Sequence, residues 1–352
     1  MSTFDYGNTR LRARLSQLLT KETLEELTRA ENIDGFLSLL IKTTYKPSIE
    51  KALTYSSGIR TVHTFLEHES EKLFIDYRKF YTDSAWKKIG LIFSYRDLQN
   101  IHTIVRGVLG NVAQPEIQNL LTRSGEIPYN ILRDLSTSRN FNELLSKMVT
   151  FHIPYTDVLI KNQTQLPSLS GAQIELMLEQ AFYQKVIEEN EKILDQTPLL
   201  KEYFAIHADQ ENIMFALRIV KNPEIVTANK LNVKDCLING GYISKSIFIA
   251  ASEKKDMEKA VEKFNGTIYY NYLQAGLTEY GSTGLLTEFE EKLKKILLER
   301  AREYQVQDPI GVGIPFGYII RKTNEMQNLL WIAKGIQLGF DSADIIEHLE
   351  VL

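Results

Sequence analysis

A short polar pattern occurs three times in this chain at nearly even spacing, and it constrains the fold more than any other feature. Each copy has an acid, an asparagine three residues later and a cation nine residues after the acid. The members are Asp97, Asn100 and Arg106; Asp209, Asn212 and Arg218; and Glu325, Asn328 and Lys334. The acids are 112 (209 − 97) and 116 (325 − 209) residues apart. Self-similarity at a long period predicts repeated structural units.

An apolar pattern precedes each polar copy, so the repeat is longer than one helix. Its first members, Leu24, Leu132 and Phe248, precede the acids by 73, 77 and 77 residues. The later members are Leu27, Ile33, Phe36 and Leu37; Leu135, Phe141, Leu144 and Leu145; and Ala251, Met257, Ala260 and Val261. This near-constant spacing is hard to produce by chance. We therefore expect three related helical domains with bounds at residues 1–114, 115–222 and 223–352.

Length and composition agree with several domains in a soluble protein. A chain of 352 residues exceeds one ordinary hydrophobic core. It is 43% hydrophobic and 24% charged, as soluble globular proteins are. The net charge of −4 argues against a strongly basic nucleic-acid-binding protein. The single cysteine, Cys236, excludes an internal disulfide, suits a reducing cytosol and is expected to be a buried apolar residue.

No sequence signal for a membrane span or a secretory leader is found. No apolar run approaches the ~20 residues that a spanning helix needs. The first ten residues also lack the apolar core of a signal peptide. We therefore expect a soluble protein, which works at a membrane only through a partner.

Apolar residues recur at helical spacing along almost the whole chain, which predicts an all-α fold. Ser94 is expected to cap the first motif helix, with Asp97 three residues later. Pro115 and Pro223 follow the first two motif cations, where those helices are expected to have ended. The segments 162–171 and 305–317 are expected to be surface loops, the second built on the turn-rich stretch 308–317.

The geometry of a helix separates the acid of each motif from its cation. At 100° per residue, Asp97 shares the apolar face with Ile101 and Ile104, whereas Arg106 lies on the opposite side. One helix therefore cannot bring acid and cation into a catalytic pair. A buried acid beside an amide suits bracing the backbone of neighbouring helices, and it needs a partner such as a helix N-terminus or a base from another helix. Contact with a partner protein is the alternative role.

Other catalytic or ligand-binding patterns are incomplete. The segment 240–246 ends in Lys245 and Ser246 but lacks the glycine before the lysine and the preceding strand of a phosphate-binding loop. His63 and His68 are five residues apart, which does not place them on one helical face for a metal ion. His102 has no counterpart in the other copies. We therefore expect no catalytic residue, no metal and no cofactor.

Three segments together resemble a known family. They are the opening residues 6–13, the motif at 97–101, and residues 324–329 followed by 333–335. In their order and threefold repetition they resemble the C subunit of the prokaryotic V/A-type rotary ATPases, which is the counterpart of the d subunit in the eukaryotic vacuolar enzyme. The resemblance covers essentially the whole chain. Glu325 and Lys334 replace the aspartate and arginine of the earlier copies, which puts the equivalence of the third motif in question.

The resemblance implies a funnel of three similar helical domains around a pseudo-threefold axis, without an active site of its own. Such a protein belongs to the rotor, where it links the axle subunits of the central stalk, of D and F type, to the membrane proteolipid ring. It couples ATP turnover to H⁺ or Na⁺ transport at the cytoplasmic face of the membrane. The isolated chain is expected to be a monomer. A helical adaptor that holds two partners without rotation is the alternative, and a cryptic hydrolase or nucleotide binder is the remaining enzymatic one.

Overall fold

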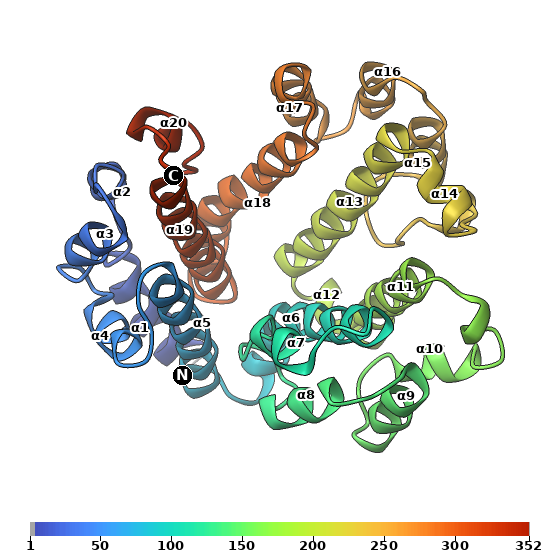
Figure 1. Ribbon diagram of the computed structural model, residues 1–352, viewed down its shortest axis with the longest axis horizontal. Coiled ribbons are helices and arrows are strands. Elements are labelled where there is room, and N and C mark those ends of the chain that lie inside the picture. The colour runs from blue at the N-terminus through green and yellow to red at the C-terminus, as the bar shows by residue number, and fades with distance from the viewer. Residues whose placement is uncertain (1–3, 352) are drawn as a thin grey trace. The chain divides into compact units, whose positions relative to one another are not determined.

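The computed structural model describes residues 4–351, and within them every regular element is a helix (Figure 1). The all-α prediction is therefore confirmed. The motif helices are α6 (Asp83–Leu109), α13 (Pro198–Lys221) and α19 (Gly313–Leu338). Pro115 and Pro223 follow the ends of α6 and α13, as the sequence predicts.

Five helices occur in the same order three times, and we call each set a repeat. Each repeat has a hairpin of two short helices, a third helix, a long helix and the motif helix. The first repeat contains α2 (Lys21–Leu27), α3 (Ile33–Leu40), α4 (Lys46–Leu53), α5 (Ile59–Phe80) and α6. The second contains α8 (Tyr129–Ser136), α9 (Phe141–Thr150), α10 (Thr156–Lys161), α11 (Gly171–Glu189) and α13. The third contains α15 (Lys245–Ser252), α16 (Met257–Val261), α17 (Tyr270–Thr283), α18 (Thr287–Gln307) and α19.

The other elements are not part of these sets. They are α1 (Asp5–Leu15), α7 (Gln114–Asn119), α12 (Glu191–Asp195), α14 (Glu224–Ala228) and α20 (Ser342–Glu347), with the 3₁₀ turns η1 (Leu166–Ser168), η2 (Val233–Asp235) and η3 (Glu262–Phe264). The segment 162–170 therefore links α10 to α11 through a single 3₁₀ turn, which agrees with the predicted loop.

The second helix of each hairpin begins at a capping side chain in the same place. Asn32, Asn140 and Asp256 each accept a hydrogen bond from the backbone N–H three residues on. Such a cap satisfies one of the free N–H groups at a helix start and is worth about 1 kcal/mol. The local sequence therefore fixes where α3, α9 and α16 begin.

The first helix of each hairpin begins with a shared apolar arrangement. The anchors of the apolar pattern occupy its fourth position, and an aliphatic residue stands just before its N-cap. In a hydrophobic staple these two positions pack together and set the angle at which the chain enters the helix. The pairs are Leu19 and Leu24 before and in α2, Ile127 and Leu132 before and in α8, and Ile243 and Phe248 before and in α15.

The chain divides by compactness into two units whose bounds differ from those of the repeats. Unit 1 contains the chain up to Phe93, Thr122–Glu126 and the chain from Leu298 onward. Unit 2 contains Ser94–Leu121 and Ile127–Leu297. Two of the divisions fall inside α6 and α18, and the other two fall between α7 and α8. In unit 1 the C-terminal helix α19 packs against α1, α3 and α5, so the two ends of the chain share one core (Figure 1).

Two local predictions are wrong, each for a physical reason. Ser94 does not cap a helix, because α6 begins at Asp83 and the buried residues Ala85 and Ile89 continue its apolar face upstream. The loop predicted at 305–317 is also shorter, since α18 ends at Gln307 and α19 begins at Gly313.

The glycines of that stretch permit close helix packing instead of a turn. A Cβ at Gly313 would lie 2.0 Å from the carbonyl oxygen of Tyr304, and one at Gly317 would lie 2.5 Å from that of Ala301. Because only a glycine leaves this space free, α19 packs closely against the backbone of α18.

Candidate functional site

The three motif acids are buried, and the three motif cations are exposed. Asp97, Asp209 and Glu325 are 3%, 0% and 5% exposed, respectively. The cations lie on the outer sides of the same helices. A buried carboxylate without partners would be strongly destabilising, so the contacts of each acid decide what the motif does.

Asp209 binds the chain just before α15. Its carboxylate accepts hydrogen bonds from the backbone N–H of Tyr242 at 2.6 Å and of Ile243 at 3.1 Å, and from the Tyr269 hydroxyl at 2.8 Å. Burial raises the pKa of Asp209, and these hydrogen bonds act in the opposite direction. The carboxylate thus ties α13 to the start of the third repeat.

The other two acids make the equivalent backbone contact. Asp97 accepts from the N–H of Ile127 at 3.0 Å. Glu325 accepts from the N–H of Leu19, and from the Tyr45 hydroxyl at 2.7 Å. Burial and the nearby Glu325 charge raise the pKa of Tyr45 well above its usual value, which keeps its hydroxyl protonated as a donor.

One backbone donor to each acid occupies the same local position. Leu19, Ile127 and Ile243 are the residues just before the N-caps of α2, α8 and α15, the position that a hydrophobic staple uses. The acid of the first repeat therefore binds the second repeat, the acid of the second binds the third, and the acid of the third binds the first. We call these contacts seams 1, 2 and 3, after the repeat that supplies the acid.

Two of the motif asparagines, Asn212 and Asn328, also bind backbone. In seam 2 the amide of Asn212 donates to the carbonyl of Ile238 at 2.9 Å and accepts from its N–H at 2.8 Å. In the third repeat Asn328 makes the same pair of bonds with Glu350, at 2.7 and 3.3 Å. A side-chain amide that satisfies both groups of one peptide residue fixes an extended segment in register.

The cations reach the long helix of the following repeat. Arg106 makes a two-pronged ion pair with Glu175 on α11, at 2.8 and 2.7 Å. Arg218 pairs with Glu290 on α18 at 3.1 Å. Lys334 makes no ion pair with any residue in the described part of the chain. Burial lowers the pKa of His63 on α5, and the charge of Lys334 lowers it further. The third cation therefore faces the expected helix but lacks the carboxylate.

Seam 3 also contains an internal counter-ion. The ammonium of Lys322 lies 2.9 Å from both Glu325 Oε1 and the Tyr45 hydroxyl, and 4.1 Å from the centroid of the Tyr45 ring. This cation, one turn before Glu325, neutralises the buried carboxylate. The described donors to Asp209 are neutral groups instead, namely two backbone N–H groups and the Tyr269 hydroxyl. The change from Asp to Glu thus coincides with the addition of a charged partner to the buried carboxylate.

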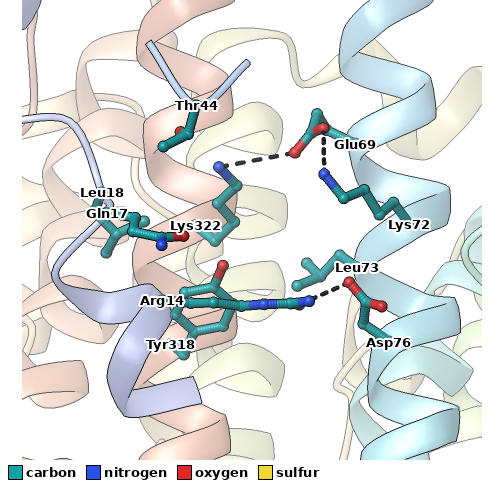
Figure 2. A pocket seen from close by; sticks show the side chains of 10 residues that line it. All are labelled: Arg14, Gln17, Leu18, Thr44, Glu69, Lys72, Leu73, Asp76, Tyr318 and Lys322. Atoms are coloured by element: carbon teal, nitrogen blue, oxygen red, sulfur yellow. Dashed lines mark hydrogen bonds and ion pairs between the residues drawn. The ribbon is translucent and has the colours of Figure 1, made fainter. Parts of the chain in front are cut away.

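A polar cavity of about 170 Å³ borders Lys322 within unit 1 (Figure 2). In Figure 2 Arg14 points to Asp76, and Lys72 and Lys322 both point to Glu69. The Arg14–Asp76 and Lys72–Glu69 distances are 2.6 and 3.2 Å. These opposite charges satisfy one another across the cavity, so the ion pairs hold α1, α5 and α19 together.

Unit 2 contains further titratable groups that are half-buried. Burial raises the pKa of Glu179, and the charge of Glu211 raises it further. Burial also raises the pKa of Glu211, which accepts a hydrogen bond from the Tyr95 hydroxyl at 3.1 Å. Burial lowers the pKa of His102 and of His207 to about 4, so both imidazoles are neutral near pH 7.

The other residues that the sequence analysis considered as possible sites lie in surroundings that suit a structural role. Gly241, within the segment that resembles a phosphate-binding loop, lies against the carboxylate of Asp209. Cys236 is buried as predicted, and burial raises the pKa of its thiol to about 11. Over residues 4–351 no cluster of three or more His, Cys, Asp or Glu side chains has a metal-binding arrangement. In the same range no helix is both long and apolar enough to cross a bilayer.

The sequence did not reveal the partners of the acids. Leu19 and Tyr45 are about 300 residues from Glu325 along the chain, and the donor at Leu19 is a backbone group, which any residue except proline has. The sequence did contain one signal for the tyrosine donors. Tyr45 and Tyr269 are 224 residues apart, the same separation as Leu24 and Phe248, so they occupy equivalent positions in the first and third repeats.

Comparison with known proteins gives consistent results over the whole length. The model of the ATP synthase (C/AC39) subunit family matches residues 7–348. The C subunit of the A-type ATP synthase of Methanothermobacter thermautotrophicus is 27% identical over 98% of this chain and 87% of its own. The protein of the same name from Methanosarcina barkeri is 26% identical over 100% and 94% of the two chains. That of Haloferax volcanii is 23% identical over 99% and 97%.

Proposed function

Because the chain belongs to the ATP synthase (C/AC39) subunit family, we propose that it is the coupling subunit of the rotor in a V/A-type ATPase. In this role it links the axle subunits of the central stalk to the membrane proteolipid ring. The observation that carries the proposal is the family match over residues 7–348, supported by relatives named as the C subunit of the A-type ATP synthase.

The seams support a mechanical role for the motif. Asp209 and Asn212 bind backbone groups of the next repeat, while Arg218 binds its long helix. One motif helix therefore holds two regions of the following repeat at once. A part that transmits torque needs such cross-links, because relative motion of its repeats would dissipate the applied force. We assign the motif residues no catalytic role.

The same pairing supports three domains arranged about a pseudo-threefold axis. Each acid binds the following repeat, and the third acid returns to the first repeat through Leu19 and Tyr45. This order of contacts is the one that a closed arrangement of three domains requires. We propose that the domains, bounded near residues 114 and 222, form a funnel whose mouth receives the axle as a socket.

The proposed position is the cytoplasmic face of the membrane, with the funnel between the axle subunits of D and F type and the ring. ATP turnover then drives, or is driven by, transport of H⁺ or Na⁺ through the ring. The isolated chain is proposed to be a monomer, since its seams are satisfied within one molecule.

Reconstitution tests this proposal. The purified chain is mixed with the axle subunits and the detergent-solubilised ring, and the mass of the product is measured by size-exclusion chromatography with light scattering. The proposal requires a three-way complex with one copy of this chain, and failure to bind either partner would overturn it.

A second assay distinguishes a coupling role from that of a static adaptor. ATPase complexes assembled with and without the chain are placed in liposomes, and ATP-driven ion uptake is compared with ATP hydrolysis. A protein that couples the two processes restores uptake. An adaptor that only holds the partners leaves hydrolysis without uptake.

A further inference from the structure

The asparagine of seam 2 binds the segment that leads into the next repeat. Asn212 holds both backbone groups of Ile238, which lies five residues before the staple residue Ile243. Ile238 is 4% exposed, so this segment is part of the packed structure. The Asn212 side chain on α13 is therefore a binding site for an extended backbone segment. We call such a site, formed by a motif asparagine, a slot.

Seam 3 cannot be completed in this way. The position five residues before its staple residue, Leu19, is Arg14. Arg14 lies inside α1 and uses its guanidinium to bind Asp76. Its backbone belongs to a helix, so it does not offer the free N–H and C=O pair that a motif asparagine binds.

The C-terminal tail supplies the missing backbone instead. Asn328 binds both backbone groups of Glu350, as Asn212 binds those of Ile238. Asn324 adds a second hydrogen bond to the Glu350 carbonyl at 2.6 Å. The slot on α19 therefore receives a segment from beyond the third repeat.

The tail is held on both sides of Glu350 by apolar contacts. Leu349 and Val351 pack against the core of unit 1 that α2, α3 and α19 share. Upstream, Ile345 of α20 is fully buried, and the indole of Trp331 donates to its carbonyl at 3.2 Å. A cavity of about 40 Å³ beside Glu350 leaves the slot incompletely filled. The side chains of Leu349 and Val351 thus anchor the tail, and the backbone of Glu350 between them binds Asn328.

We propose that residues 349–351 form a detachable strap that completes seam 3, and that the α19 slot is a binding site for an extended peptide of this sequence. The strap follows the short helix α20 and lies outside the three repeats, so it can leave without unfolding their helices. Its departure exposes Asn328 and the neighbouring Glu325 contact with Leu19. Seam 3 is then a place where the contact between the third and first repeats can be loosened and retightened. The proposal does not depend on the partners named above.

Truncation and peptide rescue test the strap. A chain that ends at His348 is compared with the full chain by thermal denaturation, and we expect its Tm to fall by about 2–6 °C. A synthetic peptide of residues 342–352 added to the truncated chain should restore the Tm in a saturable way, because a ligand that binds only the folded state stabilises it. An unchanged Tm after truncation, together with no effect of the peptide, would overturn the proposal.

Two peptide variants test recognition of the backbone. In the peptide, Glu350→Ala keeps the N–H and C=O groups and should still rescue. Glu350→Pro removes the N–H group that donates to Asn328. The concentration of this peptide needed to restore the Tm should therefore be at least tenfold higher. Equal rescue by both would show that the slot does not read the backbone.

A variant of the full chain keeps the test valid if the truncated chain does not fold. Asn328→Ala should increase hydrogen exchange of the tail amides about tenfold. Asn212→Ala, the matched change in seam 2, should leave exchange of the tail amides unaltered. Tail exchange that is the same in the Asn328→Ala protein and the wild type would contradict the proposal.

Discussion

Gly241 lies directly against the carboxylate of Asp209, where a Cβ would be only 1.9 Å from Oδ1. No backbone strain is involved, since the φ angle of Gly241 is not positive. The absence of a side chain at Gly241 is therefore what allows the acid to approach the N–H groups of Tyr242 and Ile243.

The first prediction concerns this contact. Gly241→Ala should lower the free energy of unfolding by about 1–3 kcal/mol, because the added methyl group displaces the carboxylate from its donors. Urea denaturation measures the effect. Gly281→Ala is the matched control, since Gly281 lies in α17 with open space around it. Its replacement should be neutral or stabilise by up to about 1 kcal/mol, and equal losses in both variants would contradict the steric explanation.

The second prediction separates the acid from the cation of one motif. Asp209→Ala leaves two backbone N–H groups and the Tyr269 hydroxyl without their acceptor, and should cost about 2–4 kcal/mol. Arg218→Ala removes an exposed ion pair with Glu290 and should cost at most about 1 kcal/mol. Chemical denaturation of both variants provides the comparison. Similar losses would show that the buried contact does not dominate seam 2.

The third prediction is a loss of stability in mild acid. His207 is half-buried, and its desolvation lowers its pKa to about 4, against an ordinary value of 6.5. Between these values the unfolded chain binds the proton and the folded chain does not, so the stability from neutral His207 is complete above pH 6.5 and is lost as pH falls towards 4. Thermal denaturation from pH 7.5 to 4.5 should show a shallower slope for His207→Phe than for the wild type. Parallel slopes would exclude His207 as a source of the acid sensitivity.

The fourth prediction has the opposite sign of pH dependence. Burial raises the pKa of Glu179 above its ordinary value of 4.5. The folded state therefore retains this proton longer than the unfolded state, and stability falls as pH rises from about 4.5 through the raised pKa. Glu179→Gln removes the ionisation while keeping the shape, so its gain in Tm over the wild type should be larger at pH 8.5 than at pH 5. A gain independent of pH would indicate a packing effect.

The sequence predicted the elements that depend on local patterns. The apolar spacing around Asp97 and Asp209 predicted which face of the motif helix would be buried, and burial of Ile101 and Ile213 agrees with it. Helix ends before proline were also predicted, at Pro115 and Pro223. These features follow from residues close together in the chain.

The sequence could not show which groups meet across the fold. The Glu325 contacts with Leu19 and Tyr45 join opposite ends of the chain, and one donor is a main-chain amide without any residue signature. Gly313 and Gly317 were misjudged for a related reason, because a glycine in a turn and a glycine in a close helix contact look the same in a sequence. The three-domain bounds remain a prediction.

The order of the seams means that no repeat is chemically complete by itself. An excised second repeat would expose Asp209, whose donors belong to the third, and would leave the Ile127 N–H without Asp97. Separately produced fragments should therefore fold poorly alone yet recognise each other in solution. A chain cut in the short link between α6 and α7 would be expected to reassemble by fragment complementation. The cut ends would stay unjoined, and the hydrogen bonds of the buried carboxylates would align the two fragments.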